Sequence, residues 1–149
     1  MLPALKKFLE SDNDGTFFVG HASVLARIDH KLIMIDFDNV IHSMDKGFHD
    51  GTIYGNPIDG TKEALEKLSL KYDISIYSCK ANPDRPLIEG KNGIELIWEW
   101  LHKHNLAKFI KSVTYDKLNA VAYIDDKAIE FINWNDCLLK FYNRKLLDE

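Results

Sequence analysis

Features that define several classes of protein are scarce in this chain of 149 residues. Two cysteines, Cys79 and Cys137, cannot build a disulfide framework or a CxxC zinc knuckle, so we expect reduced thiols. No apolar run approaches the ~18 residues of a membrane span. The N-terminal segment lacks the long apolar stretch of a signal peptide. The expectation is a cytoplasmic protein without a membrane partner.

Positive charge is also in short supply. The chain has 19 Lys and Arg against 23 Asp and Glu, which gives a net charge of −4 and a pI near 5.8. Binding to nucleic acid usually needs a basic face, so the overall charge does not indicate such a partner, although it leaves room for a local basic patch. With 46% hydrophobic and 28% charged residues, the composition is that of a globular protein, and the length favours one domain over 1–149. Nothing in the sequence indicates an oligomeric state.

Apolar periodicity divides the chain into three parts. An extension over 1–30 is expected to form a short helix and a hairpin. The core, 31–132, alternates strands with helices, and a tail over 133–149 is expected to contain a helix near 136–147. The core strands are expected at 31–35, 73–77, 109–114 and 120–124, and the helices at 61–70, around 94–101, and at 128–132. Such alternation is typical of an α/β fold with a mainly parallel central sheet.

The stretch 42–60 is rich in glycine, which predicts a loop or a short flap hairpin rather than a helix. Its histidines, His42 and His49, are expected to be exposed and without a specific role. On the helix near 94–101, Trp98 is expected in the core. Trp100 is expected on the other face, against solvent or a partner.

Residues that carry chemistry stand at strand ends. The apolar segment LIMIDFDNV, 32–40, ends in Asp36 and Asp38, which strand alternation places on the same side. Neighbouring carboxylates repel each other and are costly to desolvate, so their presence points to a bound cation or a reaction. Ser78 and Asp125 each follow another predicted strand. Ligands of parallel sheets bind beyond the carboxyl ends of the strands, and we expect these side chains to converge there.

Four elements follow one another along the chain: Asp36-x-Asp38 in IDFDNV, Ser78 in ISIYS, Lys117 in YDKLNA, and Asp125-Asp126 in YIDD. In this order they resemble the four motifs of the haloacid dehalogenase (HAD) superfamily. The resemblance covers 32–131 and implies a Rossmann-like three-layer fold. Cap domains of that family are inserted between the first and second elements, here Asp38 to Ser78, or between the second and third, here Ser78 to Lys117. Here each of these intervals has room for only a helix and loops, so no sizeable cap is expected.

The resemblance also implies a role for each residue. Asp36 is the expected nucleophile, which forms an aspartyl-phosphate, and Asp38 the expected acid and base. Ser78 and Lys117 are expected to bind the transferred phosphoryl group. Lys80 stands where relatives often carry a basic residue and, with Asn39, is assigned to substrate binding. The expected Mg²⁺ ligands are Asp36, Asp38 (in the family through its backbone carbonyl), Asp125 and Asp126.

The sequence therefore predicts a Mg²⁺-dependent phosphohydrolase whose open site accepts a phosphorylated small molecule or macromolecule. The segment DFDNVIHS and the glycines after it also resemble small bacterial and phage HAD proteins related to polynucleotide phosphatases. Two alternatives stay open: a polynucleotide end-processing phosphatase, and a catalytically silent module that binds a phospho-ligand or a protein. By itself, Asp125-Asp126 could simply cap the helix expected after it.

Overall fold

The computed structural model describes residues 31–148, so the helix and hairpin expected within 1–30 lie outside the described residues. The elements run in the order β1 (Lys31–Asp36), α3 (Thr61–Ser69), β2 (Tyr72–Tyr77), η1 (Cys79–Ala81), α4 (Gly93–Lys103), η2 (Ala107–Phe109), β3 (Ser112–Thr114), β4 (Ala122–Ile124) and α5 (Trp134–Asn143). Each of the four core strands predicted from the sequence overlaps an observed one.

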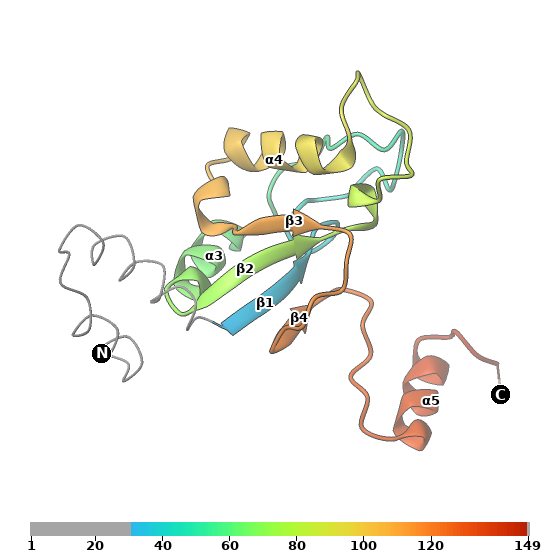
Figure 1. Ribbon diagram of the computed structural model, residues 1–149. Helices are drawn as coiled ribbons and strands as arrows, with labels where there is room; N and C mark the ends of the chain where they lie inside the picture. The colour runs from blue at the N-terminus through green and yellow to red at the C-terminus, as the bar shows by residue number, and fades with distance from the viewer. Residues whose placement is uncertain (1–30, 149) are drawn as a thin grey trace, which may run out of the picture.

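The four strands form a single parallel sheet in the order β3-β2-β1-β4 (Figure 1). In the register, Ile35 of β1 lies opposite Ile76 of β2 and Ile124 of β4. The expectation of an α/β fold with a parallel sheet is confirmed. Since the chain passes from β1 to β2 and β3 on one side and returns to β4 on the other, the direction of winding changes between β1 and β4.

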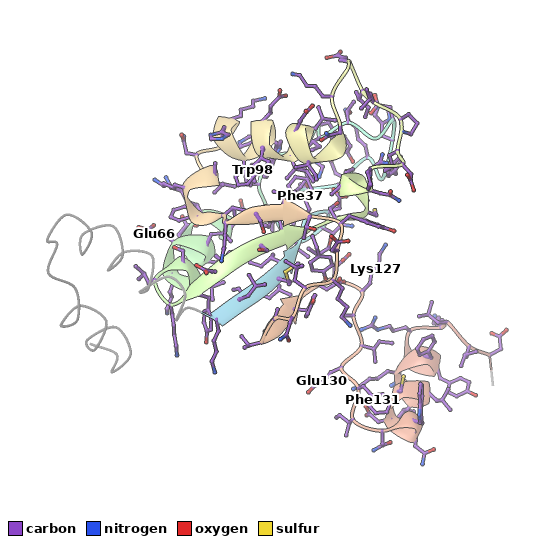
Figure 2. All side chains as sticks on the ribbon, viewed as in Figure 1. Phe37, Glu66, Trp98, Lys127, Glu130 and Phe131 are labelled. Atoms are coloured by element: carbon purple, nitrogen blue, oxygen red, sulfur yellow. The ribbon has the colours of Figure 1, made fainter. Side chains whose placement is uncertain are left out.

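One face of the sheet carries the core. Alternate residues of β1 and β2 point to this face and meet α3 and α4, which both lie over it (Figure 1). The residues that build this cluster include Ile33, Ile35, Phe37, Leu65, Ile74, Ile76, Ile97 and Leu101. Figure 2 shows Phe37 beneath α4, just beyond the end of β1. The first strand is thereby fixed close to its carboxyl end.

The expected three-layer arrangement is only partly seen. No helix among residues 31–148 covers the opposite face of the sheet, and α5 stands apart from the sheet (Figure 1). The chain between β3 and β4 contains no helix, and the segment after β4 leads away from the sheet (Figure 1). The described residues therefore form one helical layer on a parallel sheet. Neither the interval from Asp38 to Ser78 nor that from Ser78 to Lys117 contains a further domain.

A close approach fixes the start of α4 beside β2. Asn92 caps the helix, and its side chain and that of Glu95 form a reciprocal capping box. A Cβ atom on Gly93 would lie 1.6 Å from the carbonyl oxygen of Lys80, so only glycine fits there. Since Lys80 belongs to η1, this contact holds the segment after β2 against α4.

Some local predictions are wrong. The helix expected at 128–132 does not form, and the strand expected over 109–114 is only Ser112–Thr114, because Phe109 ends η2. Residues 42–60 form a loop that contains only isolated bridges, such as the one between His42 and Pro57.

The two tryptophans of α4 lie differently from the expectation. Trp100 is 4% exposed, whereas Trp98 is only half-buried at the edge of the core. The indole Nε1–H of Trp100 donates to the carbonyl of Gly55, so this residue tethers the 42–60 loop. Both cysteines are free thiols, as predicted. Within residues 31–148, no helix combines the length and apolar character required to cross a bilayer.

Candidate metal and phosphoryl-transfer site

Three carboxylates meet at the carboxyl edge of the sheet. Asp36 ends β1, and Asp125 and Asp126 directly follow β4, the parallel neighbour of β1. One oxygen from each can be chosen so that all lie within 4.8 Å of one another. This meeting point is where the direction of winding changes, the usual place for a ligand in an open parallel sheet. The structure therefore brings Asp36 together with Asp125 and Asp126, as predicted, whereas the carboxylate of Asp38 is not part of this group.

The environment of Asp36 opposes its negative charge. Burial raises its pKa to about 7, with further contributions from a hydrogen bond with Asp126 and the charges of Asp125 and Asp126. The backbone N–H of Phe37 donates to Asp36 Oδ1 at 2.8 Å and opposes this shift only in part. A cation bound beside Asp36 would therefore favour its ionised form.

Asp125 is held as an anion by its neighbours. Its Oδ1 accepts the backbone N–H groups of Lys127 and Ala128 at 2.7 and 3.2 Å, and its Oδ2 accepts the hydroxyl of Tyr77. Although burial opposes them, these bonds lower the pKa of Asp125. The capping role considered from the sequence is real, but the cap closes a turn rather than a helix. A carboxylate has about four lone-pair sites, so three donors leave room for one more partner.

The carboxylate of Asp38 lies in a different environment and is not part of this acidic cluster. Its Oδ1 accepts from Lys80 Nζ at 2.8 Å and from His42 Nδ1 at 2.9 Å. Burial alone would raise the pKa of Asp38, but the two hydrogen bonds and the charge of Lys80 outweigh it and lower the pKa. Although Asp36 and Asp38 are only two positions apart in the sequence, their neighbours shift the pKa values of the two carboxylates in opposite directions.

Ser78 and Lys80 link β2 to Asp38. Ser78 is buried, and its Oγ accepts the backbone N–H of Lys80 at 3.1 Å, so that it caps η1. This turn directs the side chain of Lys80 to Asp38, and Lys80 itself is 1% exposed. A fully buried lysine needs a charged partner, which Asp38 supplies. The structure thus brings Ser78, Lys80 and Asp38 together.

Lys117 and Asn39 are less closely integrated. Lys117 is exposed, with Nζ 5.6 Å from the ring centroid of Tyr123. Within residues 31–148 it forms no ion pair with any of the four predicted aspartates. Asn39 is exposed in the left-handed region with φ of 64° and donates its backbone N–H to the carbonyl of His42. Asparagine tolerates this conformation better than most residues, which suits it to the turn after β1.

Two residues of the site were not predicted from the sequence. His42, expected to be exposed, has no exposed surface and contacts Asp38. Tyr77, expected only as the end of a strand, donates to Asp125. The available hints were weak: His42 follows the apolar pair Val40-Ile41, and Tyr77 is the last residue of a strand next to β1.

Comparisons of this chain with models of known protein families, with curated proteins and with solved structures found no match. The interpretation of the site therefore depends on its own geometry and chemistry.

Proposed function

We propose that this protein is a Mg²⁺-dependent phosphohydrolase that transfers the phosphoryl group of a monoester to Asp36 and then to water. The observation that supports this most strongly is the meeting of Asp36, Asp125 and Asp126 from two strands at one edge of the sheet. Three carboxylates this close are unfavourable without a compensating charge. Burial is the largest cause of the raised pKa of Asp36, and the hydrogen bond with Asp126 and the charges of Asp125 and Asp126 add to it.

The donor set fits magnesium. All the donors are carboxylate oxygens, which hard divalent cations prefer, and Asp126 is exposed, so water can complete the coordination. Asp36, Asp125 and Asp126 would hold the ion. When bound, it would neutralise charge between these carboxylates and the incoming phosphate.

In the first half-reaction, an oxygen of Asp36 attacks phosphorus and the bond from phosphorus to the ester oxygen breaks. The leaving oxygen takes a proton from Asp38. In the second half-reaction, Asp38 takes a proton from water, the water oxygen attacks phosphorus, and the bond to Asp36 breaks. The products are an alcohol and inorganic phosphate, with both aspartates restored.

The partners of Asp38 suit the second half-reaction directly, because Lys80 and His42 favour the ionised carboxylate that acts as a base. The first half-reaction requires a proton on Asp38. The negative charge of a bound phosphate raises the proton affinity of nearby carboxylates and competes for Lys80, which favours that proton. Ser78 has a hydroxyl hydrogen to donate to a phosphoryl oxygen, and Lys117 and Lys80 supply positive charge.

The experiment is hydrolysis of a generic aryl phosphate with and without Mg²⁺, in the wild type and in Asp36→Asn. We expect Mg²⁺-dependent turnover that the variant loses by a factor on the order of 10³ or more. The matched control is Asp84→Asn, an exposed aspartate in the loop before α4, which should leave turnover unchanged. Wild-type turnover in Asp36→Asn would show that the nucleophile is misassigned. Mg²⁺ binding without turnover of any ester would instead favour a phospho-ligand-binding module.

A further inference from the structure

His42 lies in the loop after β1 and has no exposed surface. Its ring stacks on Phe37 with centroids 5.1 Å apart and planes 6° from parallel, and Trp100 and Tyr54 meet it edge-on. These contacts fix the plane of the imidazole. Both ring nitrogens are therefore held in place before any substrate arrives.

The two hydrogen bonds of the ring define its tautomer. Nε2 lies 2.8 Å from the backbone nitrogen of Gly55, and a backbone N–H can only donate, so Nε2 must accept. The ring proton is then on Nδ1, which lies 2.9 Å from Asp38 Oδ1 and donates to it. His42 is thus a neutral imidazole with one assigned acceptor and one assigned donor.

The backbone at Gly55 is matched to this arrangement. A Cβ atom there would lie 1.9 Å from the carbonyl oxygen of Ser43 and 2.9 Å from His42 Nε2. The N–H of Gly55 can therefore approach the ring only because the residue is glycine. At the other end of the network, Lys80 donates to the same oxygen of Asp38 that His42 does, so both donors occupy Oδ1.

We propose that His42 is a positioning residue for Asp38: locked as the Nδ1–H tautomer by Gly55, it acts with Lys80 to fix Oδ1 and to present Oδ2 to the reacting groups. This inference rests on the proposed function, because it gives Asp38 its part in phosphoryl transfer. His42 is not part of the acidic cluster and has no exposed surface with which to contact a substrate. It acts by holding the carboxylate in one orientation, and a misplacement of about 1 Å in such a group can lower a rate about 100-fold.

Two variants divide the functions of the ring. In His42→Asn, the side-chain amide replaces Nδ1 and keeps a donor toward Asp38, but Gly55 loses its acceptor. In His42→Gln, the amide oxygen reaches the place of Nε2 and keeps the acceptor for Gly55, but the donor to Asp38 is lost. We expect His42→Gln to have a kcat about 10- to 100-fold below the wild type with KM nearly unchanged. We expect His42→Asn to keep a kcat within a few-fold of the wild type, although its Tm should fall more than that of His42→Gln.

His102→Asn, at an exposed position of α4, is the matched control and should leave both kcat and Tm unchanged. A purely structural role would lower kcat in proportion to Tm in both variants, and that result would overturn the proposal. A kcat of His42→Gln above that of His42→Asn would also overturn it. A second measurement does not depend on activity. The ¹⁵N spectrum of the wild-type imidazole, assigned by its loss in His42→Asn, should show a protonated Nδ1 and an unprotonated Nε2 at neutral pH. The opposite tautomer would overturn the positioning role even if the enzyme is active, whereas an inactive wild type with the expected tautomer would contradict the proposed function instead.

Discussion

The hydroxyl of Tyr77 donates a hydrogen bond to Oδ2 of Asp125, although the two residues come from strands on opposite sides of β1. Tyr77 is the register partner of Asp36, so its side chain crosses the end of β1 to reach the carboxylate beyond it. Burial raises the pKa of Tyr77, and the bond to Asp125 and the charge of that carboxylate raise it further, so the phenol stays a donor. Tyr77 therefore helps to hold one carboxylate of the acidic cluster in place.

Tyr77→Phe should weaken binding of Mg²⁺. Loss of a residue that orients a metal ligand usually lowers affinity by a factor of about 10 to 100. We expect the Mg²⁺ concentration for half-maximal turnover to rise about 10-fold and the free energy of unfolding to fall by about 1 kcal/mol. Tyr72→Phe, at the other end of β2, is the control. Metal titrations that coincide for wild type and Tyr77→Phe would show that this bond has no influence on the ion.

Asp36→Asn should stabilise the metal-free protein, and the gain should depend on pH. The pKa of Asp36 is about 7 in the folded protein and about 3.8 in the unfolded chain. A raised pKa means that the folded state holds the proton more tightly, so the stability contributed by protonated Asp36 is lost as pH rises through that interval. Asp36→Asn should be as stable as the wild type below pH 3.8 and more stable than the wild type above about pH 7.

Denaturant unfolding in the presence of a chelator, at one pH below 3.8 and one above about 7, measures the stability that Asp36→Asn gains. Asp125→Asn provides the opposite case, because the pKa of Asp125 is lowered by its donors and the loss of its charge should reduce stability. Asp36→Asn should therefore be the more stable of the two at high pH. If the stability difference between wild type and Asp36→Asn is the same at both pH values, the raised pKa of Asp36 is not its cause.

Asp126→Ala should raise the Mg²⁺ requirement while the protein stays folded. Asp126 is exposed, and its removal takes one oxygen from the acidic cluster and also one cause of the raised pKa of Asp36. We expect about a 10-fold higher Mg²⁺ concentration for half-maximal turnover, with a smaller change in turnover at saturating metal. Glu66→Ala on the outer face of α3 removes an acidic side chain far from the site and should change neither quantity (Figure 2). A normal titration for Asp126→Ala would remove this residue from the metal site.

The sheet and its acidic edge could be predicted because their signals are local. An apolar run that ends in Asp36 marks a buried strand and its carboxyl end within a few residues, and the same holds for Asp125. Once the strands are taken as parallel, the general geometry of such sheets places their ends together. The meeting of Asp36 and Asp125 could therefore be predicted without knowledge of side-chain contacts.

The partners of Asp38 could not be predicted in this way. Lys80 is far from Asp38 in sequence, and its approach depends on the turn at Ser78 and the closeness of Gly93 to that turn. His42 is near Asp38, but its burial depends on Trp100 of α4 and on Gly55, which lies 13 residues further along the same loop. Glycine-rich composition suggested an exposed loop, whereas tertiary contacts hold part of this loop in the core.

The wrong prediction of a helix at 128–132 has a related cause. Asp125 offers its Oδ1 to two backbone N–H groups, as a helix cap does, yet the residues after it are mostly exposed. A single short turn is marginal in water without packing, and this segment has little. Instead, Arg144 of the tail donates to the carbonyls of Lys127 and Ala128, which satisfies those groups in a non-helical conformation.

Trp100→Phe tests whether the 42–60 loop owes its position to α4. The indole N–H of Trp100 donates to the carbonyl of Gly55 at 2.8 Å, and the same ring meets Phe37 and His42 edge-on. Phenylalanine fills much of the same volume but leaves that carbonyl without this donor. We expect a loss of about 2 kcal/mol in the free energy of unfolding, measured in urea.

Trp134→Phe, at a position 70% exposed, should cost less than about 0.5 kcal/mol and serves as the control. Because Gly55 also holds the ring of His42, Trp100→Phe should lower kcat through Asp38 more than it changes KM. Equal stability of Trp100→Phe and Trp134→Phe would mean that the loop is held by its remaining contacts. In that case α4 would not influence Asp38 through Gly55.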